Sequence, residues 1–227
     1  MSWVRGVVSP IQRFTGEPLS FMRDNLVVVP FEGAAEDTKD EPLDLVLYTL
    51  PPSNSVAKKQ HGGACGLYFI TMKSVLRYSA AAVSVGEFKG YFCPYKTDNT
   101  LGTVISNKAD MMFTAAMDGC SFGIGSEGAQ GERLVYHSNL AGMGSASDQS
   151  RQGQAQDMTL RMVLGGRTET VFSPADYRTD STGEQQRSTT FGLRDVVSGK
   201  WSFYSQTYTS QPGAIRTFVL KTVTQIA

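Results

Sequence analysis

The sequence predicts a mostly antiparallel β fold of the α+β class. Short apolar, β-branched and aromatic runs recur along the chain with turn residues between them, as is typical of such a fold. Helical periodicity is scarce. The chain of 227 residues is long enough to bury a sizeable core, and no shift in composition divides it. We therefore expect one domain over residues 1–227, in which residues 1–20 could form an N-terminal extension.

The expected elements follow from these runs and from the polar stretches between them. Strands are predicted over residues 26–31, 44–50, 66–72, 81–88, 90–95, 121–125, 133–137, 158–164, 168–172, 188–197, 200–209 and 214–223. The best helix candidate is 106–117, an Ala- and Met-rich run that Ser106 would cap, although its length also allows a buried strand. Polar, Gly-rich composition predicts loops over 32–42, 51–63 and 141–157.

Charge and hydropathy exclude two classes of partner. Lys and Arg total 21, Asp and Glu total 21, and no long basic block occurs, so we expect no nucleic-acid partner. No apolar run is long enough for a transmembrane helix, and the N-terminus lacks the pattern of a signal peptide. We expect a soluble protein without a signal peptide, which leaves secretion or injection by another route open.

The few cysteines and histidines define the candidate sites. Cys65, Cys93 and Cys120 are too few and too dispersed for a disulfide framework, and no CxxC or HExxH spacing indicates zinc. Cys93 lies between aromatic residues, which is typical of a core thiol. His61 and Cys65 share one loop, a spacing that suits a metal or a chance encounter. Cys120 and His137 flank a Gly-rich turn and are the stronger pair.

A hairpin would bring Cys120 and His137 together. If residues 121–125 and 133–137 pair around a turn centred between Gly128 and Ala129, Cys120 lies directly opposite His137. Opposite residues project to the same face with Cβ atoms about 4.5–5.5 Å apart, which allows a thiol and an imidazole to reach hydrogen-bonding distance. A bulge in the turn would shift the pairing by one residue and turn one side chain to the other face.

Such proximity is what a cysteine nucleophile needs. A thiol beside an imidazolium can have a pKa of about 4–7 instead of about 8.5, so Cys120 would be the nucleophile and His137 the proton acceptor. The third group that orients the imidazole could be the Thr114 hydroxyl, Asp118 or a backbone carbonyl. Gly119 would let a substrate approach closely, and the backbone N–H of Cys120 would help to bind an oxyanion. The alternative is a buried thiol near a solvated imidazole.

The window that contains these residues resembles a known family. The string ISNKADMMFTAAMDGCSFGIGSEGAQGERLVYH is similar to the active-site region of the glutamine deamidase toxins that include the Burkholderia lethal factor and the catalytic domain of the cytotoxic necrotising factors. In that family a Leu-Ser-Gly-Cys run carries the nucleophile, a histidine follows on the next strand, and the lethal factor has a threonine six residues before the cysteine. The matching positions here are Asp110, Met111, Phe113, Thr114, Gly119, Cys120 and His137.

The resemblance implies a role for three of these positions. Cys120 would be the nucleophile, His137 the base and Thr114 the orienting group. Gly119 and Asp118, which directly precede the thiol, are the candidate oxyanion or supporting residues. The implied fold is a β-sandwich with a few flanking helices. Weaker similarity covers GYFCPYKTDNTLGTV before the window and GKWSFYSQTYT near the C-terminus.

One residue departs from the family pattern. Leu-Ser-Gly-Cys is Met-Asp-Gly-Cys here, which places the carboxylate of Asp118 two residues from the thiol. An anion so close raises a thiol pKa unless its side chain points away or pairs with a cation such as Arg133. The hairpin loop is also longer than in the family.

The function implied by the resemblance is that of a virulence toxin. It would convert a specific glutamine of a target protein to glutamate through a Cys120 thioester, without a metal or an organic cofactor. Interception of the thioester by an amine would make the protein a transglutaminase, and the further alternatives are another cysteine hydrolase or an inactive β-sandwich binding protein. Family members act on host Rho-type GTPases or a translation initiation helicase, neither of which can be transferred here. We expect a monomer that is secreted or delivered into a host cytoplasm. The loops at 51–63 and 141–157 are the candidates for contact with the protein substrate, and the alternative is that they are solvated linkers.

Overall fold

The computed structural model describes residues 8–30, 40–76, 81–143, 149–178 and 184–227. Strands make up 48% of the described structure and helices 20%, and antiparallel pairing dominates the sheets. The expectation of a mostly β fold of the α+β class is therefore confirmed.

The described residues form many strands, a few short helices and one longer helix, α4. The helices are α1 (Pro10–Gly16), α2 (Pro18–Asp24), α3 (Lys73–Leu76), α4 (Gln149–Leu164) and α5 (Pro174–Tyr177), with a 3-10 turn η1 (Ala141–Met143). The strands are β1 (Leu26–Val28), β2 (Leu43–Thr49), β3 (Ser55–Lys59), β4 (Ala64–Cys65), β5 (Leu67–Met72), β6 (Val83–Cys93), β7 (Asn99–Ile105), β8 (Met111–Thr114), β9 (Ser121–Gly125), β10 (Arg133–Asn139), β11 (Thr168–Phe172), β12 (Arg187–Arg194), β13 (Trp201–Gln211) and β14 (Arg216–Gln225).

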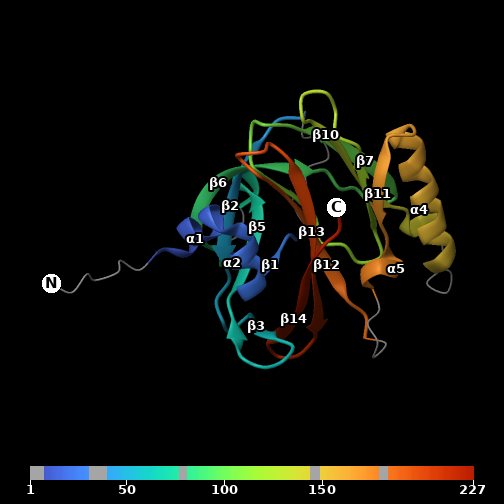
Figure 1. Cartoon of the computed structure of the whole chain (residues 1–227). Coiled ribbons are helices and arrows are strands. Elements are labelled where there is room, and N and C mark those ends of the chain that lie inside the picture. Colours follow the sequence, from blue (N-terminus) through green and yellow to red (C-terminus); the bar gives the residue numbers. More distant parts are fainter. Residues whose placement is uncertain (1–7, 31–39, 77–80, 144–148, 179–183) are drawn as a thin grey trace.

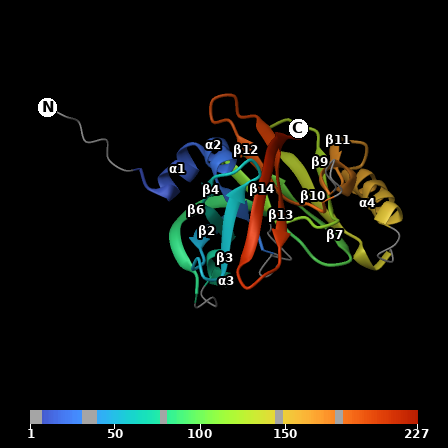
Figure 2. The same ribbon diagram turned by 90° about the horizontal axis from the view of Figure 1, so that it is seen from below.

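These strands form two sheets. The large sheet has ten strands in the order β1-β5-β2-β6-β8-β12-β13-β14-β3-β4, and the small sheet has four in the order β11-β9-β10-β7. Only β1 with β5, β6 with β8, and β14 with β3 pair in parallel within the described residues. Helix α4 lies along the small sheet at one side of the molecule, and α1 and α2 lie at the opposite side (Figure 1). Figure 2 shows the same arrangement from below.

Strand β8 is buried on both faces and therefore connects the two halves of the core. Its side chains alternate, so Met112 packs into the core shared with the small sheet, whereas Met111 and Phe113 pack with Phe14 of α1. Thr114 has the same parity as Met112 and faces the small sheet. The position of β8 thus places the Thr114 hydroxyl in the space between the sheets.

The small sheet is covered on its outer face by α4. Gln156, Leu160 and Leu164 recur every four residues on this helix and are buried against β9. The facing positions of β9 are glycines, and a Cβ atom at Gly123 would lie 2.9 Å from Leu160 Cδ2. Gly125 likewise lies next to Leu164. The SFGIG run therefore directs its large side chains inward and leaves a smooth outer surface for the helix.

The N-terminal helices belong to the folded core. A capping box between Ser9 and Gln12 begins α1. Phe14 and Phe21 are buried and meet edge to face with ring centroids 5.3 Å apart. Within the described residues, no helix is long and apolar enough to cross a membrane.

Several expected elements differ from the structure. The helix preferred over 106–117 is wrong, and the buried strand that this run also allowed is present, because residues 111–114 form β8, which is buried on both faces. The loop expected over 141–157 and the strand expected over 158–164 are also wrong, because α4 runs through both. Its buried stripe is narrow and begins with a glutamine, so the apolar pattern did not indicate a helix.

Smaller corrections concern two other segments. The loop expected over 51–63 contains β3, which extends the edge of the large sheet by pairing with β14. The strands expected over 81–88 and 90–95 are one continuous strand, β6. Most of the loop expected over 32–42 lies outside the described residues.

Candidate active site

Thr114 and His137 meet across the space between the two sheets. Thr114 Oγ1 lies 2.6 Å from His137 Nδ1 and donates a hydrogen bond of 3.2 Å to the carbonyl oxygen of Cys93. Because a hydroxyl has one proton, Thr114 then accepts its bond from the Nδ1–H of the imidazole. This tautomer leaves a lone pair on Nε2, which is buried and has no hydrogen-bond partner. The arrangement presents Nε2 as an oriented proton acceptor.

The surroundings of His137 keep the imidazole neutral. The residue is only 1% exposed, and the edge of the Tyr95 ring packs against it with centroids 4.9 Å apart. Asn139 Nδ2 donates a 2.8 Å hydrogen bond to the Tyr95 hydroxyl, which connects the end of β10 to the segment between β6 and β7 next to the imidazole. Burial lowers the pKa of His137 to about 3, because the imidazolium would lose its hydration there.

Cys120 lies on the same face as His137 but not directly opposite it. Strands β9 and β10 pair His137 with Phe122. The same register, extended by two residues, places Cys120 opposite Asn139. The expected direct opposition is therefore wrong by two residues. A shift of two preserves the alternation, so Cys120 and His137 are diagonal neighbours, for which Cα separations of about 7–8 Å are typical. The thiol makes no hydrogen bond to Nε2.

The turn between these strands explains the register. Gly128 N–H donates a 2.8 Å hydrogen bond to the carbonyl oxygen of Glu132, and Gly131 N–H donates to the carbonyl oxygen of Gly128. These bonds centre the turn near Gln130. The expected centre lay between Gly128 and Ala129, about one residue earlier. A turn centre that moves by one residue moves every cross-strand pair by two.

The surroundings of Cys120 favour the protonated form of its thiol. It is 1% exposed, and burial raises its pKa to about 12. The charge of Asp118 adds to the increase, whereas hydrogen bonds from the Asp118 backbone and the Asn139 side chain, and the charge of Arg178, oppose it. The pair at rest is thus a neutral thiol and a neutral imidazole, not a preformed thiolate with an imidazolium.

The Asp118 side chain points to the surface and is paired there. Its carboxylate lies 3.0 Å from the guanidinium of Arg187 and 3.9 Å from that of Arg178. Arg133, the cation that the sequence suggested, instead pairs with Glu169 and Glu127. Two cations therefore offset the charge that departs from the family pattern.

Gly119 has a conformational role beside the thiol. Its φ of +90° is in the left-handed region, and a Cβ atom there would lie 2.7 Å from Arg178 Nη1. Its N–H donates a 3.0 Å hydrogen bond to the Tyr177 hydroxyl, which itself donates to the carbonyl oxygen of Cys120 at 2.9 Å. The Gly119 N–H is therefore engaged, which leaves the Cys120 N–H as the candidate oxyanion donor.

Helix α4 holds the turn that carries the thiol from the other side. Gln156 is fully buried; its Nε2 donates to the carbonyl oxygen of Gly119 at 3.1 Å, and its Oε1 accepts from Ser121 Oγ at 2.6 Å. Neither Gln156 nor Tyr177 was expected at the site. The spacing of Gln156, Leu160 and Leu164 could have indicated a helix face, but no sequence signal pointed from α5 to the thiol.

Of the other candidate residues, His61 and Cys65 lie apart from this site, whereas the carbonyl oxygen of Cys93 accepts the hydrogen bond of Thr114. His61 is exposed and Cys65 is half-buried, and no group of three or more possible metal ligands occurs among the described residues. Cys93 is fully buried, which raises the pKa of its thiol, in agreement with a core position. None of the best-formed cavities of the described residues is lined by Cys120 or His137.

Comparison with known proteins gives no assignment, because no protein-family model and no curated protein matches the chain. The chemistry of the site must therefore be inferred from its own residues.

Proposed function

We propose that the protein is a cysteine-dependent amidohydrolase that converts glutamine side chains of a target protein to glutamate. The observation that carries the proposal is the Thr114 to His137 hydrogen bond, which leaves Nε2 unprotonated and without a partner on the face where Cys120 lies. A nucleophile, a base and a third group that orients the base are the parts that covalent acyl transfer requires.

In the proposed reaction, His137 Nε2 accepts and returns the proton at each step. The Cys120 thiol passes its proton to His137 Nε2, and sulfur attacks the carboxamide carbon of glutamine. The tetrahedral oxyanion is stabilised by the backbone N–H of Cys120. The C–N bond then breaks, and ammonia leaves with the proton from Nε2. Water, deprotonated by Nε2, hydrolyses the thioester to glutamate and regenerates the thiol.

The neutral resting pair implies that catalysis begins with a rearrangement. Charge separation is unfavourable while Cys120 and His137 are both buried and not hydrogen-bonded to each other. If the Cys120 side chain turns toward Nε2, the thiolate and the imidazolium offset each other's loss of hydration. Entry of a substrate requires an opening at the same place. We propose that substrate binding supplies both changes.

The resemblance to the deamidase toxins supports the proposal. Of the residues that match the family, Thr114, Cys120 and His137 face the core between the two sheets, whereas Met111 and Phe113 pack on the other face of β8. The two facing sheets enclose one core, which fits the β-sandwich that the resemblance implies. We propose on these grounds that the chain has the fold of that family; the target protein is not assigned.

A second candidate is a binding protein that has this fold and no catalytic activity. It is favoured by the burial of Cys120, which raises the pKa of the thiol and excludes solvent from it. In such a protein Thr114, His137 and Cys93 would form an internal hydrogen-bond network that stabilises the contact between the sheets.

Mass spectrometry of treated lysates distinguishes the two candidates. Host-cell lysate is incubated with wild-type protein, with Cys120→Ser, or with Cys65→Ser as a matched control outside the site. The proposal expects a glutamine that becomes glutamate, a gain of about one mass unit, with wild type and Cys65→Ser and not with Cys120→Ser. Equal peptide masses in all samples would favour the binding protein. A labelled primary amine added to the same lysate separates deamidation from transglutamination.

A further inference from the structure

A cavity between strands of the large sheet is a second region with features of a ligand site. Strands β1, β2 and β5 approach β13 and β14 there and leave a cavity of about 510 Å³. Its apolar walls include Tyr48 stacked on Phe69 at 5.4 Å and Tyr208 tilted on Phe218 at 6.0 Å. These four aromatic residues belong to the buried core of the protein. The walls are therefore preformed, as in most small-molecule sites, and the volume is within the usual range of such sites.

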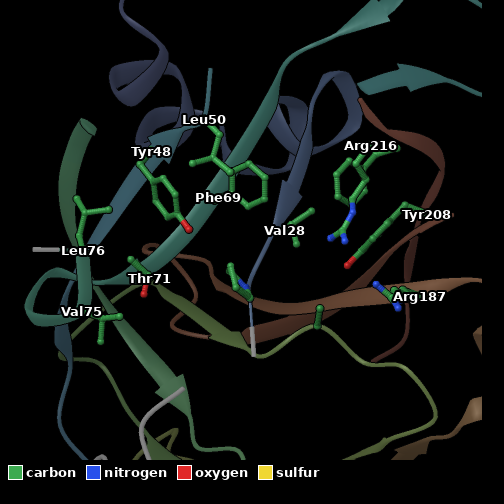
Figure 3. A pocket seen from close by; sticks show the side chains of 13 residues that line it. Val28, Tyr48, Leu50, Phe69, Thr71, Val75, Leu76, Arg187, Tyr208 and Arg216 are labelled. Atoms are coloured by element: carbon green, nitrogen blue, oxygen red, sulfur yellow. The ribbon is translucent and has the colours of Figure 1, made fainter. Parts of the chain in front are cut away.

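The charged side chains that line this cavity are cations. Arg187 and Arg216 line it, and no described acidic residue does. Figure 3 shows the guanidinium of Arg216 and the hydroxyl of Tyr208 directed toward each other at one side, with Arg187 beside them. Arg216 is exposed and has no ion-pair partner among the described residues, whereas Arg187 pairs with Asp118 outside the cavity.

We propose that the cavity binds a small apolar carboxylate. The apolar body would pack between the aromatic walls, and the carboxylate would accept hydrogen bonds from Arg216 and from the Tyr208 hydroxyl. Arginine suits this role because its planar guanidinium binds a carboxylate with two parallel hydrogen bonds. An unpaired arginine beside an apolar cavity that no described acidic residue lines favours an anion over a neutral ligand or a cation.

The location of the cavity makes it independent of the proposed catalytic chemistry. Thr114 and His137 do not line it, and the cavity reaches the thiol segment only through Ala116 and the Arg187 to Asp118 pair. Binding there would thus be measurable in a protein whose candidate nucleophile has been replaced by Ser. Failure of this proposal would leave the proposed function unaffected.

Calorimetric titration with two ligands of equal length tests the proposal. Decanoate, below its micelle concentration, and decanol are titrated into wild type, Arg216→Gln and Arg161→Gln. Arg161 is an exposed arginine of α4 that pairs only within its helix, so its variant is the matched control. We expect decanoate to bind wild type and the control at least about tenfold more tightly than decanol, and Arg216→Gln to lose that difference.

Two further measurements keep the test decisive. The Tm of each variant checks folding, and Leu50→Trp, which should fill the cavity from its wall, is expected to abolish binding of decanoate. Absence of decanoate binding to wild type, equal binding of the two ligands, or unchanged binding by Arg216→Gln would overturn the proposal. So would binding to phosphatidylglycerol vesicles without decanoate binding, since that would indicate a membrane surface and not a small carboxylate.

Discussion

Two regions on either side of the segment from Thr114 to Asp118 differ in what they offer a ligand. The candidate active site has a nucleophile, a base and an orienting hydroxyl, but Cys120 and His137 are both 1% exposed. The cavity beside Arg216 is lined by no described cysteine or histidine, but it offers about 510 Å³ of space between buried aromatic walls, and Arg216 at its side is exposed in the resting structure. The candidate active site has reactive groups that are buried, whereas the cavity has room for a ligand and an arginine to bind it.

The difference shows what burial does to reactive groups. The thiol and the imidazole lie on one face of one hairpin, yet exclusion of water moves their pKa values apart and keeps both neutral. The arginine beside the cavity is charged, because a guanidinium is effectively always protonated in proteins. A catalytic role for the first region thus requires an opening, whereas the second can bind a ligand as it is.

The largest expected effect concerns the reactivity of the Cys120 thiol. Burial raises its pKa from an ordinary 9.0 to about 12, so at pH 8 the native thiol should react with iodoacetamide about 10³-fold more slowly than the same thiol in the urea-unfolded chain. The native rate should rise about tenfold per pH unit between pH 8 and 10. Peptide mapping by mass spectrometry measures the rate, with the half-buried Cys65 as the internal comparison.

A contrary result would remove the contrast between the regions. Rapid alkylation of Cys120 that is already constant below pH 7 would mean that a thiolate is formed and accessible without substrate. The candidate active site would then be as open as the cavity.

The next effect concerns His137 and acid stability. Its pKa in the folded protein is about 3 against an ordinary 6.5, so the unfolded chain takes up the proton first as pH falls. Stability from the neutral imidazole is complete above pH 6.5 and is lost toward pH 3, with a slope of up to about 1.4 kcal/mol per pH unit. His137→Gln should lack this slope. Urea unfolding at pH 7, 6, 5 and 4 measures it.

His61→Gln is the control for this measurement, because His61 is exposed and distant from the site. Carboxylates that titrate at low pH contribute to all three proteins, so the difference between the curves isolates the imidazole. Parallel curves for wild type and His137→Gln would show that water or a counter-charge reaches His137, contrary to a sealed site.

A smaller effect tests the backbone next to the thiol. Gly119→Ala places a side chain at a φ of +90° and against Arg178, so we expect a loss of about 1–3 kcal/mol in the free energy of unfolding. Gly153→Ala is the matched control, since Gly153 lies in α4 with open space around it and should gain about 0.5–1 kcal/mol. Equal changes in both variants would mean that Gly119 has no special conformation.

The parts of the fold that local patterns determine were predicted well from the sequence. The bounds of β9 and β11 agree with the expected 121–125 and 168–172, because each is a short apolar run between turn residues. Helix α4 was missed because its buried stripe holds a glutamine, Gln156, whose polarity reads as a loop. Strand β8 was expected as a helix because burial on both faces removes the alternation that identifies a strand.

The candidate site likewise has parts that the sequence predicted and parts that it did not. The proximity of His137 to the Thr114 hydroxyl, one of the open alternatives for the third group, is present in the structure. The cross-strand register was not predictable, since it depends on the hydrogen bonds of one asymmetric turn. The contacts from Tyr177 and Gln156 to the thiol turn depend on long-range packing, and no local pattern encodes them.

The smallest expected effect concerns Asp118, the residue that separates the two regions. Its charge raises the pKa of the Cys120 thiol, while its pairs with Arg187 and Arg178 hold those cations on the surface. Asp118→Asn removes the anion and frees both guanidinium groups, so the thiol pKa should fall and alkylation of Cys120 at pH 8 should rise about two- to fivefold.

The same variant should leave stability within about 1 kcal/mol of wild type, because partly exposed ion pairs contribute little. It should also tighten decanoate binding at the cavity, since Arg187 would no longer be shared with a carboxylate. Asp157→Asn, which removes the acid of the exposed α4 ion pair, is the matched control and should change neither property. Faster alkylation without tighter decanoate binding would show that Arg187 does not connect the two regions and that the thiol responds to the lost anion alone.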